Sequence, residues 1–166
     1  MTLRELQSPR IQALHSQARV LLCRIPGAEG DLAADLATIE EAGVDLILCL
    51  VREGELGNYG RAAGDADRWR FRWHHCPTPA SCEEASAPAL RAALEEAIST
   101  LKEGRTLLIH CQYGQVRTGC AAAALLVFLG ASPQEATNAV ESAGSFPFQD
   151  GPLALFDCLC ESAALP

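Results

Sequence analysis

Apolar residues occur along this chain in two spacings, short unbroken runs and longer stretches with apolar positions three or four apart. The unbroken runs at 20–25, 44–51 and 106–109 predict strands that are buried on both faces. In the segment 68–73, arginines alternate with tryptophan or phenylalanine, which predicts a strand with one covered face.

The stretches with helical spacing have recognisable start and stop residues. Asp31 is a candidate N-cap and Gly43 a stop for one helix, and Ser132-Pro133-Gln134-Glu135 reads as a capping box that starts another. The predicted helices span 31–42, 88–102, 117–129, 133–142 and 152–163. The helix at 117–129 is apolar on all sides, so we expect it at the centre of the protein.

Alternation of strands and helices predicts an α/β fold, with a mostly parallel central sheet flanked by helices on both faces. At 166 residues the chain is expected to form a single domain, 1–166, with a core at about 20–162. In such sheets ligands bind beyond the carboxyl ends of the strands.

Composition narrows the functional classes. The formal net charge of −8 argues against nucleic acid or an anionic membrane as a partner, so any phosphate affinity must be local to one pocket. No apolar run is long enough to span a bilayer, and residues 1–10 do not read as a secretory signal. We therefore expect a cytoplasmic protein, and a monomer.

The eight cysteines indicate neither a disulfide framework nor a metal centre. Most of them lie in apolar runs, where a thiol behaves as a small hydrophobe. Cys158-x-Cys160 lacks the usual zinc spacing, and the same argument counts against His74-His75-Cys76. We expect a reducing compartment, no metal and no cofactor.

The chemistry concentrates in residues 110–119, between the strand at 106–109 and the central helix. A helix N-terminus offers unpaired N–H groups and a positive dipole, which bind an anion and stabilise a nearby thiolate such as that of Cys111. Arg117, at the first helical turn, can fork two donors onto a phosphate. The loop is therefore predicted to bind phosphate and to aim a nucleophile at it.

His110-Cys111-x₅-Arg117-Thr118-Gly119 resembles the signature loop of the cysteine-based protein tyrosine and dual-specificity phosphatases. Further segments follow the order seen in the kinase-associated phosphatase (cyclin-dependent kinase inhibitor 3) branch. These segments are 25–27, 48–56, 74–77 and 145–149. The resemblance spans about 20–162 and implies that family's fold and its phosphoric monoester hydrolase activity on phosphorylated proteins.

The resemblance also implies a role for each residue of the loop. Cys111 would form a cysteinyl-phosphate intermediate, and Thr118 would donate a hydrogen bond to its thiolate. His110 would hold the loop in shape. The phosphate would be bound by the Arg117 guanidinium and by backbone N–H groups of Gln112, Tyr113, Gly114, Gln115, Val116 and Arg117.

The general acid departs from the family pattern. Where the family has an aspartate, this chain has Ala80. Glu83 and Glu84 are the nearest carboxylates and are candidate acids, although either one alone fits an exposed charge leading into a helix somewhat better. His75 is a further candidate, but its place at a strand end suits a structural role. The acid is left unassigned.

Two other residues match family positions. Gln149 corresponds to a glutamine that helps to place the hydrolytic water. Cys49 corresponds to a strand-end position that holds a possible redox partner for Cys111, because two cysteines within about 7 Å can form a reversible disulfide. Each residue equally suits an ordinary role, as a loop glutamine or a core thiol.

The variable loop positions contain no lysine, which favours a phosphoprotein over a polyphosphorylated inositide. We expect hydrolysis of phosphotyrosine and, in a shallow cleft, of phosphoserine or phosphothreonine. The missing aspartate leaves open a catalytically weak phosphate-binding pseudophosphatase or scaffold. Arsenate reduction or sulfur transfer on the same kind of loop is a further alternative.

Overall fold

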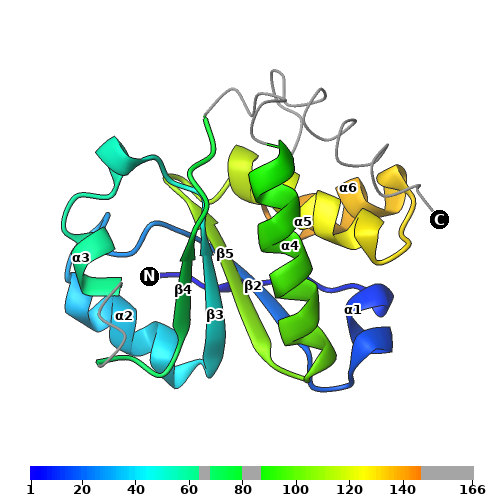
Figure 1. The fold of residues 1–166 in the computed structure, drawn as a ribbon, viewed down its shortest axis with the longest axis horizontal. Coiled ribbons are helices and arrows are strands. Elements are labelled where there is room, and N and C mark those ends of the chain that lie inside the picture. Colours follow the sequence, from blue (N-terminus) through cyan, green and yellow to red (C-terminus); the bar gives the residue numbers. More distant parts are fainter. Residues whose placement is uncertain (64–67, 80–86, 147–166) are drawn as a thin grey trace.

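The computed structural model describes residues 1–63, 68–79 and 87–146 (Figure 1). Within these ranges the strands are β1 (Arg4–Glu5), β2 (Arg19–Arg24), β3 (Val44–Cys49), β4 (Arg72–His75) and β5 (Thr106–Cys111). The helices are α1 (Pro9–Leu14), α2 (Leu32–Glu41), the 3₁₀ helix η1 (Glu53–Glu55), α3 (Tyr59–Ala63), α4 (Ala87–Lys102), α5 (Val116–Phe128) and α6 (Pro133–Ser142).

The strands form one sheet in the order β1-β2-β5-β3-β4. β2, β5, β3 and β4 run parallel, and only β1 pairs antiparallel with its neighbour. The predicted α/β fold with a mostly parallel sheet is confirmed. The carboxyl ends of β2, β5 and β3 therefore meet at one edge, with β5 in the middle.

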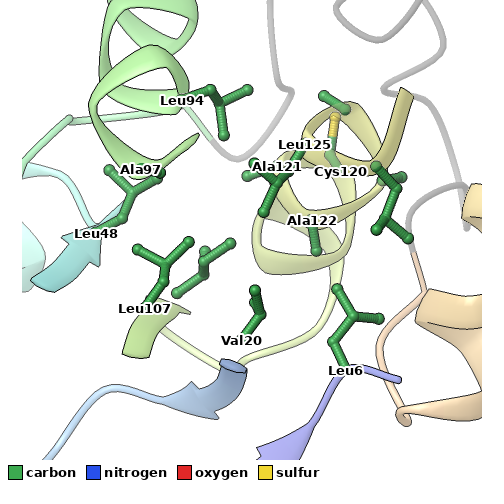
Figure 2. Close-up of a cluster of buried hydrophobic side chains, with 14 of the residues drawn as sticks. Leu6, Val20, Leu48, Leu94, Ala97, Leu107, Cys120, Ala121, Ala122 and Leu125 are labelled. Carbon is green, nitrogen blue, oxygen red and sulfur yellow. The ribbon is translucent and has the colours of Figure 1, made fainter. Parts of the chain in front are cut away.

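Helices cover both faces of the sheet (Figure 1). α2 and α3 pack on one face, and α1, α4, α5 and α6 pack on the other. Figure 2 shows the hydrophobic core on the face covered by α1, α4, α5 and α6, in which side chains of three strands lie opposite α4 and α5. The labelled strand residues are Val20, Leu48 and Leu107, and the labelled helix residues include Leu94, Ala97, Ala121 and Leu125.

α5 is buried on all sides, as its sequence predicts, with residues 117–126 all buried. A run of alanines allows close approach of the helix to its neighbours, because small side chains bring helix axes together. The helix that starts at the candidate site is thus fixed by packing around its whole circumference.

The predicted caps are present. Asp31 accepts hydrogen bonds from the N–H groups of Ala33 and Ala34, and Ser132 and Glu135 form the reciprocal capping box at the start of α6. Gly43 has a φ of 71°, as expected for the residue just beyond a helix end.

The segment 68–73 was predicted as a strand, but β4 begins only at Arg72. Trp69 stacks on Phe71, with ring centroids 5.6 Å apart, and its indole N–H donates to the Ala62 carbonyl, 2.8 Å away. The aromatic rings therefore pack toward α3, and the backbone of 68–71 does not pair with β3.

β1 and α1 were not predicted, because each is too short to produce a periodic pattern. The predicted helix at 152–163 lies outside the described residues. None of the described helices combines the length and the apolar run needed to cross a lipid bilayer.

Candidate active site

Cys111 is the last residue of β5, and α5 begins five residues later at Val116. All six residues of β5 are buried, and Cys111 itself is only 2 % exposed. The chain thus leaves the middle of the sheet, turns over residues 112–115 and enters the central helix. This is the strand–loop–helix arrangement that the sequence predicted, with the helix starting one residue earlier.

The backbone of this turn presents a row of unused donors. Among the described residues, no hydrogen bond uses the N–H groups of residues 112–116, and the Gln115 side chain makes no capping bond to the helix. Successive N–H groups at a helix start make a concave site for an anion, which the helix dipole reinforces.

Arg117 is held in place by a carboxylate. Its Nη1 and Nη2 atoms donate to the two carboxylate oxygens of Glu55, at 2.7 and 3.1 Å. Nη1 also donates to the carbonyl oxygens of Leu50 and Thr78, at 3.2 and 3.1 Å. The Arg117 side chain is only 6 % exposed, and these bonds fix the direction of its guanidinium.

The contact with Arg117 lowers the pKa of Glu55. Hydrogen bonds from Arg117 are the largest cause that lowers it, from 4.5 to about 2, although partial burial acts in the opposite direction. Glu55 is therefore a carboxylate at neutral pH, and it balances the arginine charge when no other anion is bound.

Gly114 is the point at which the loop touches β2. Its φ is 68°, and a Cβ atom here would lie 2.4 Å from the carbonyl oxygen of Cys23. The Gly114 carbonyl accepts hydrogen bonds from the Arg4 guanidinium and, at 2.8 Å, from the Ser145 hydroxyl. The loop thus packs against β2 and is held by hydrogen bonds from two segments far along the chain, at Arg4 and Ser145.

His110 precedes Cys111 and is fully buried. Its Nε2 atom lies 2.7 Å from the Tyr59 hydroxyl, and the Tyr59 ring meets the imidazole edge-on. Burial is the main cause that lowers the pKa of His110 to about 3. A neutral imidazole held by a tyrosine suits the predicted structural role better than proton transfer at neutral pH.

Cys49 is the register partner of His110, at the end of β3. It is a free, buried thiol, and burial raises its pKa to about 12, while the nearby Arg117 charge lowers it slightly. The pairing of Cys49 with Cys111 stays a prediction. The hydroxyl of Thr118 is fully buried and has no hydrogen-bond partner among the described residues, so its predicted bond to the Cys111 sulfur also stays a prediction.

The loop side chains differ in exposure. Tyr113 is 71 % exposed, whereas Gln112 and Val116 are half-buried and Gln115 is exposed. A phosphate cradle at this loop would thus be made by its backbone, with Tyr113 standing at its mouth.

Of the candidates for the general acid, the structure describes only His75. Ala80, Glu83, Glu84 and the water-placing candidate Gln149 lie outside the described residues. His75 is described: its Nε2 atom lies 2.7 Å from the Val51 carbonyl oxygen, and its Nδ1 atom lies 3.6 Å from Glu53. These contacts give His75 a structural role at the end of β4.

No group of three or more histidine, cysteine, aspartate or glutamate side chains within the described ranges could hold a metal ion. Sequence reasoning missed Glu55, Tyr59, Arg4 and Ser145. All four act on the loop from far along the chain. Glu55 and Ser145 lie in segments 48–56 and 145–149, which carry the family resemblance, but the sequence does not show that they contact the loop.

Comparison with known proteins adds family evidence to this geometry. Residues 33–138 match a model of the tyrosine phosphatase family. The mouse cyclin-dependent kinase inhibitor 3 is 29% identical over 132 residues, which cover 72% of this chain and 60% of the mouse protein. The rat protein is 28% identical over the same span. The chain thus spans about 60% of the length of these relatives.

Solved structures show the same fold. A kinase associated phosphatase with its catalytic cysteine replaced by serine superposes with a TM-score of 0.73 at 23% identity, covering 98% of this chain and 93% of that one. Tk-PTP in its active form gives 0.68 at 24% identity, covering 89% and 94%. A human tyrosine phosphatase-like serine/threonine/tyrosine-interacting protein gives 0.68 at 17% identity, covering 87% and 91%.

Proposed function

Because this chain belongs to the tyrosine phosphatase family, we propose that it removes phosphoryl groups from proteins through a cysteinyl-phosphate intermediate. Its substrates would carry phosphotyrosine or, if the cleft is shallow, phosphoserine or phosphothreonine. The observation that carries the proposal is the arrangement around Cys111. Within the described residues, a row of backbone N–H groups makes no hydrogen bond, and it lies beside the cysteine and a fixed arginine.

In the first step, the Cys111 sulfur attacks phosphorus and the bond from phosphorus to the substrate oxygen breaks. The N–H groups of residues 112–116 and the Nε edge of Arg117 would stabilise the three equatorial oxygens. The Glu55 carboxylate binds the opposite edge of the guanidinium, between Nη1 and Nη2, and so orients it. The departing oxygen takes a proton from a general acid or from water.

In the second step, water attacks phosphorus, the bond from sulfur to phosphorus breaks, and inorganic phosphate leaves. A hydrogen bond from Thr118 to the sulfur would stabilise the departing thiolate, and Gln149 would place the water. The Thr118 hydroxyl is buried and has no partner in the described part of the chain, which supports the first role because it needs an acceptor.

Glu83 and Glu84 remain the proposed acids for the first step. Loss of a positioned acid costs about 10²- to 10⁴-fold in rate. Hydrolysis of an aryl phosphate, whose phenolate leaves without help, should therefore depend on these glutamates less than hydrolysis of an alkyl phosphate does.

Para-nitrophenyl phosphate hydrolysis tests the proposal. We expect turnover by the wild type, loss of at least about 10³-fold in Cys111→Ser, and near wild-type rates in a Cys120→Ser control. Equal rates in Cys111→Ser would contradict the mechanism. Phosphopeptide binding without wild-type turnover would instead identify a phosphate-binding protein, and arsenate reduction or sulfur transfer would identify the other chemistries of such loops.

Cys49 would protect the nucleophile. Hydrogen peroxide oxidises the Cys111 thiolate to a sulfenic acid, and attack by Cys49 then forms a disulfide and releases water. Peroxide-treated wild type should regain activity with dithiothreitol. In Cys49→Ser, further peroxide oxidises the unprotected Cys111 sulfenic acid to the irreversible sulfinic acid, so recovery should be lost.

We further propose a cytoplasmic monomer. Cys23, Cys49, Cys76 and Cys111 are free thiols, which supports a reducing compartment. Light scattering after size-exclusion chromatography should give a mass near 17.7 kDa.

A further inference from the structure

Arg4 of β1 reaches the loop that joins β5 to α5, residues 111–117. β1 pairs antiparallel with β2, where Arg4 is the register partner of Leu22. Arg4 is half-buried, and its guanidinium donates hydrogen bonds to the carbonyl oxygens of Gly114 in the loop and of Gly144 after α6. One side chain on the edge strand therefore holds both the loop and the segment that follows α6.

Two other carbonyl groups of the loop are held by backbone donors. The Gln112 carbonyl accepts from the Ile25 N–H, 3.5 Å away, just beyond β2. The Gln115 carbonyl accepts from the Gly119 N–H, 2.6 Å away, at the start of α5. The C=O and N–H groups of a trans peptide unit point in opposite directions. Each of these bonds therefore also fixes the direction of the N–H group of the next residue.

The Gly114 carbonyl is held by side chains instead. Among the described residues no backbone N–H donates to it, whereas Arg4 and, at 2.8 Å, the Ser145 hydroxyl do. A peptide unit beside glycine rotates easily, because glycine lacks a Cβ atom. These two side chains therefore decide the direction of the Gln115 N–H, one of the loop donors that bond to no described residue. A rotated peptide unit would turn its carbonyl oxygen toward the phosphate and repel it.

Arg4 also brings a positive charge to the back of the loop. Arg19, on the neighbouring strand, forms an ion pair with Glu5 at 3.1 Å, whereas no carboxylate within the described ranges pairs with Arg4. Burial raises the pKa of the thiol of Cys23, the residue on which Gly114 packs, and the Arg4 charge opposes that rise. A charged donor on a carbonyl strengthens the hydrogen bond that the N–H of the same peptide unit makes. The charge thus favours an anion on the other side of this peptide unit.

We propose that Arg4 is a positioning residue for the oxyanion that the loop binds. By holding the Gly114 carbonyl, it keeps the Gln115 N–H directed at a phosphate oxygen, and its charge strengthens that hydrogen bond. The inference rests on the proposed function, because it places the phosphoryl group in this loop. It adds to the site a residue that lies 110 positions before Gly114 in the sequence.

Inhibition by inorganic phosphate tests the proposal, together with hydrolysis of para-nitrophenyl phosphate. Arg4→Met lacks the charge and the donors, so it should raise the inhibition constant of phosphate and lower kcat/KM, each about tenfold. Arg4→Lys, which keeps the charge and a donor, should recover most of both losses. Arg19→Met removes the same charge from the neighbouring strand and should stay within about twofold of the wild type.

The inhibition constant distinguishes positioning from a role in stability alone. Its value does not depend on the fraction of the protein that is folded, whereas the apparent kcat does. An unchanged inhibition constant in Arg4→Met, with only a lower kcat and a lower thermal midpoint, would overturn the proposal. An equal rise in Arg19→Met would overturn it as well, because net charge would then account for the effect.

Ser145→Ala tests whether the two side chains act on one peptide unit. This variant keeps Arg4 and should weaken phosphate binding only about threefold. Arg4→Met/Ser145→Ala leaves the Gly114 carbonyl without a donor, so phosphate binding should weaken about 100-fold, the usual cost of one lost oxyanion donor. A double variant that binds phosphate as well as Arg4→Met does would contradict control of the Gln115 N–H through this carbonyl.

Calorimetry with inorganic phosphate separates this inference from the proposed function, because binding needs no turnover. If the wild type fails to hydrolyse para-nitrophenyl phosphate but binds phosphate more tightly than Arg4→Met, the catalytic proposal fails and the role of Arg4 stands. If the wild type is active and the two proteins bind phosphate equally, the proposed function stands and the role of Arg4 fails.

Discussion

Two strand–loop–helix units lie side by side at the carboxyl edge of the sheet: β2 with α2, and β5 with α5. Their last strand residues, Arg24 and Cys111, are register partners. In both units the chain leaves a parallel strand, turns, and enters a helix that covers one face of the sheet (Figure 1). Only the second unit has the features of an anion site.

The two units differ in whether a side chain of the protein accepts hydrogen bonds from the backbone N–H groups at the turn and the start of the helix. In the β2 unit, Asp31 accepts from Ala33 and Ala34, and Asp35 accepts from the N–H of Gly27 at 2.7 Å. In the β5 unit, the Gln115 side chain makes no capping bond to any residue that the structure describes. A helix start therefore becomes available to an external anion when the sequence omits its own acceptor.

The largest expected effect concerns how tightly each turn is packed. Gly114→Ala would place a Cβ atom 2.4 Å from a backbone oxygen at a φ of 68°, so we expect a loss of about 3 kcal/mol in unfolding free energy and of most activity. In the β2 unit, the Cβ atom of Gly27→Ala would lie 3.0 Å from the Leu32 side chain. We expect this variant to lose about 1 kcal/mol in unfolding free energy.

Urea denaturation of the two glycine variants measures this contrast. A similar cost at both positions would contradict it.

The next effect comes from giving α5 the acceptor that α2 already has. Gln115→Asp should lower kcat/KM for para-nitrophenyl phosphate about 10- to 100-fold, because a carboxylate there would compete with the substrate and repel it. Gln115→Asn, which adds no charge, is the control. An unchanged rate in Gln115→Asp would mean that the helix start does not bind phosphate.

A smaller effect distinguishes strand β5 from strand β2: the pH dependence of stability that a buried histidine adds. His110 of β5 is opposite Cys23 of β2, and burial lowers the pKa of His110 from 6.5 to about 3. The unfolded state therefore binds a proton between these values, and the free energy of unfolding falls as the pH drops below 6.5. The expected slope is about 1.4 kcal/mol per pH unit.

Urea denaturation between pH 4.5 and 6.5 isolates this contribution, because the lowered pKa of Glu55 makes that group matter only below pH 4.5. His110→Asn should flatten the profile. If the unfolding free energies of the wild type and the variant changed in parallel with pH, His110 would not be the source of the pH dependence.

The smallest effect concerns the cap of α2. Asp31→Ala should cost about 1 kcal/mol of unfolding free energy, the usual worth of an N-cap, and leave kcat/KM unchanged. Asp31→Asn, which keeps an acceptor, should cost less. A change in catalytic rate would mean that the β2 unit takes part in phosphate binding, contrary to the comparison.

The sequence by itself was sufficient for features with local causes. Helical spacing and capping residues predicted α2 and α6, and an all-apolar run predicted α5, each to within one residue at each end, because the signals lie within the segment they describe. The loop from Cys111 to Arg117 was recognisable for the same reason: the cysteine, the N–H groups and the arginine all come from one turn of chain.

Only the tertiary structure showed what holds that loop. Glu55 reaches Arg117 across 62 residues, Tyr59 reaches His110 across 51, and Ser145 anchors Gly114 across 31. Arg24 lies beside Cys111 because β2 is the neighbour of β5 in the sheet. These contacts depend on strand order and register, which hydrophobic periodicity leaves open because it reports which face of an element is buried, not which element lies next to it.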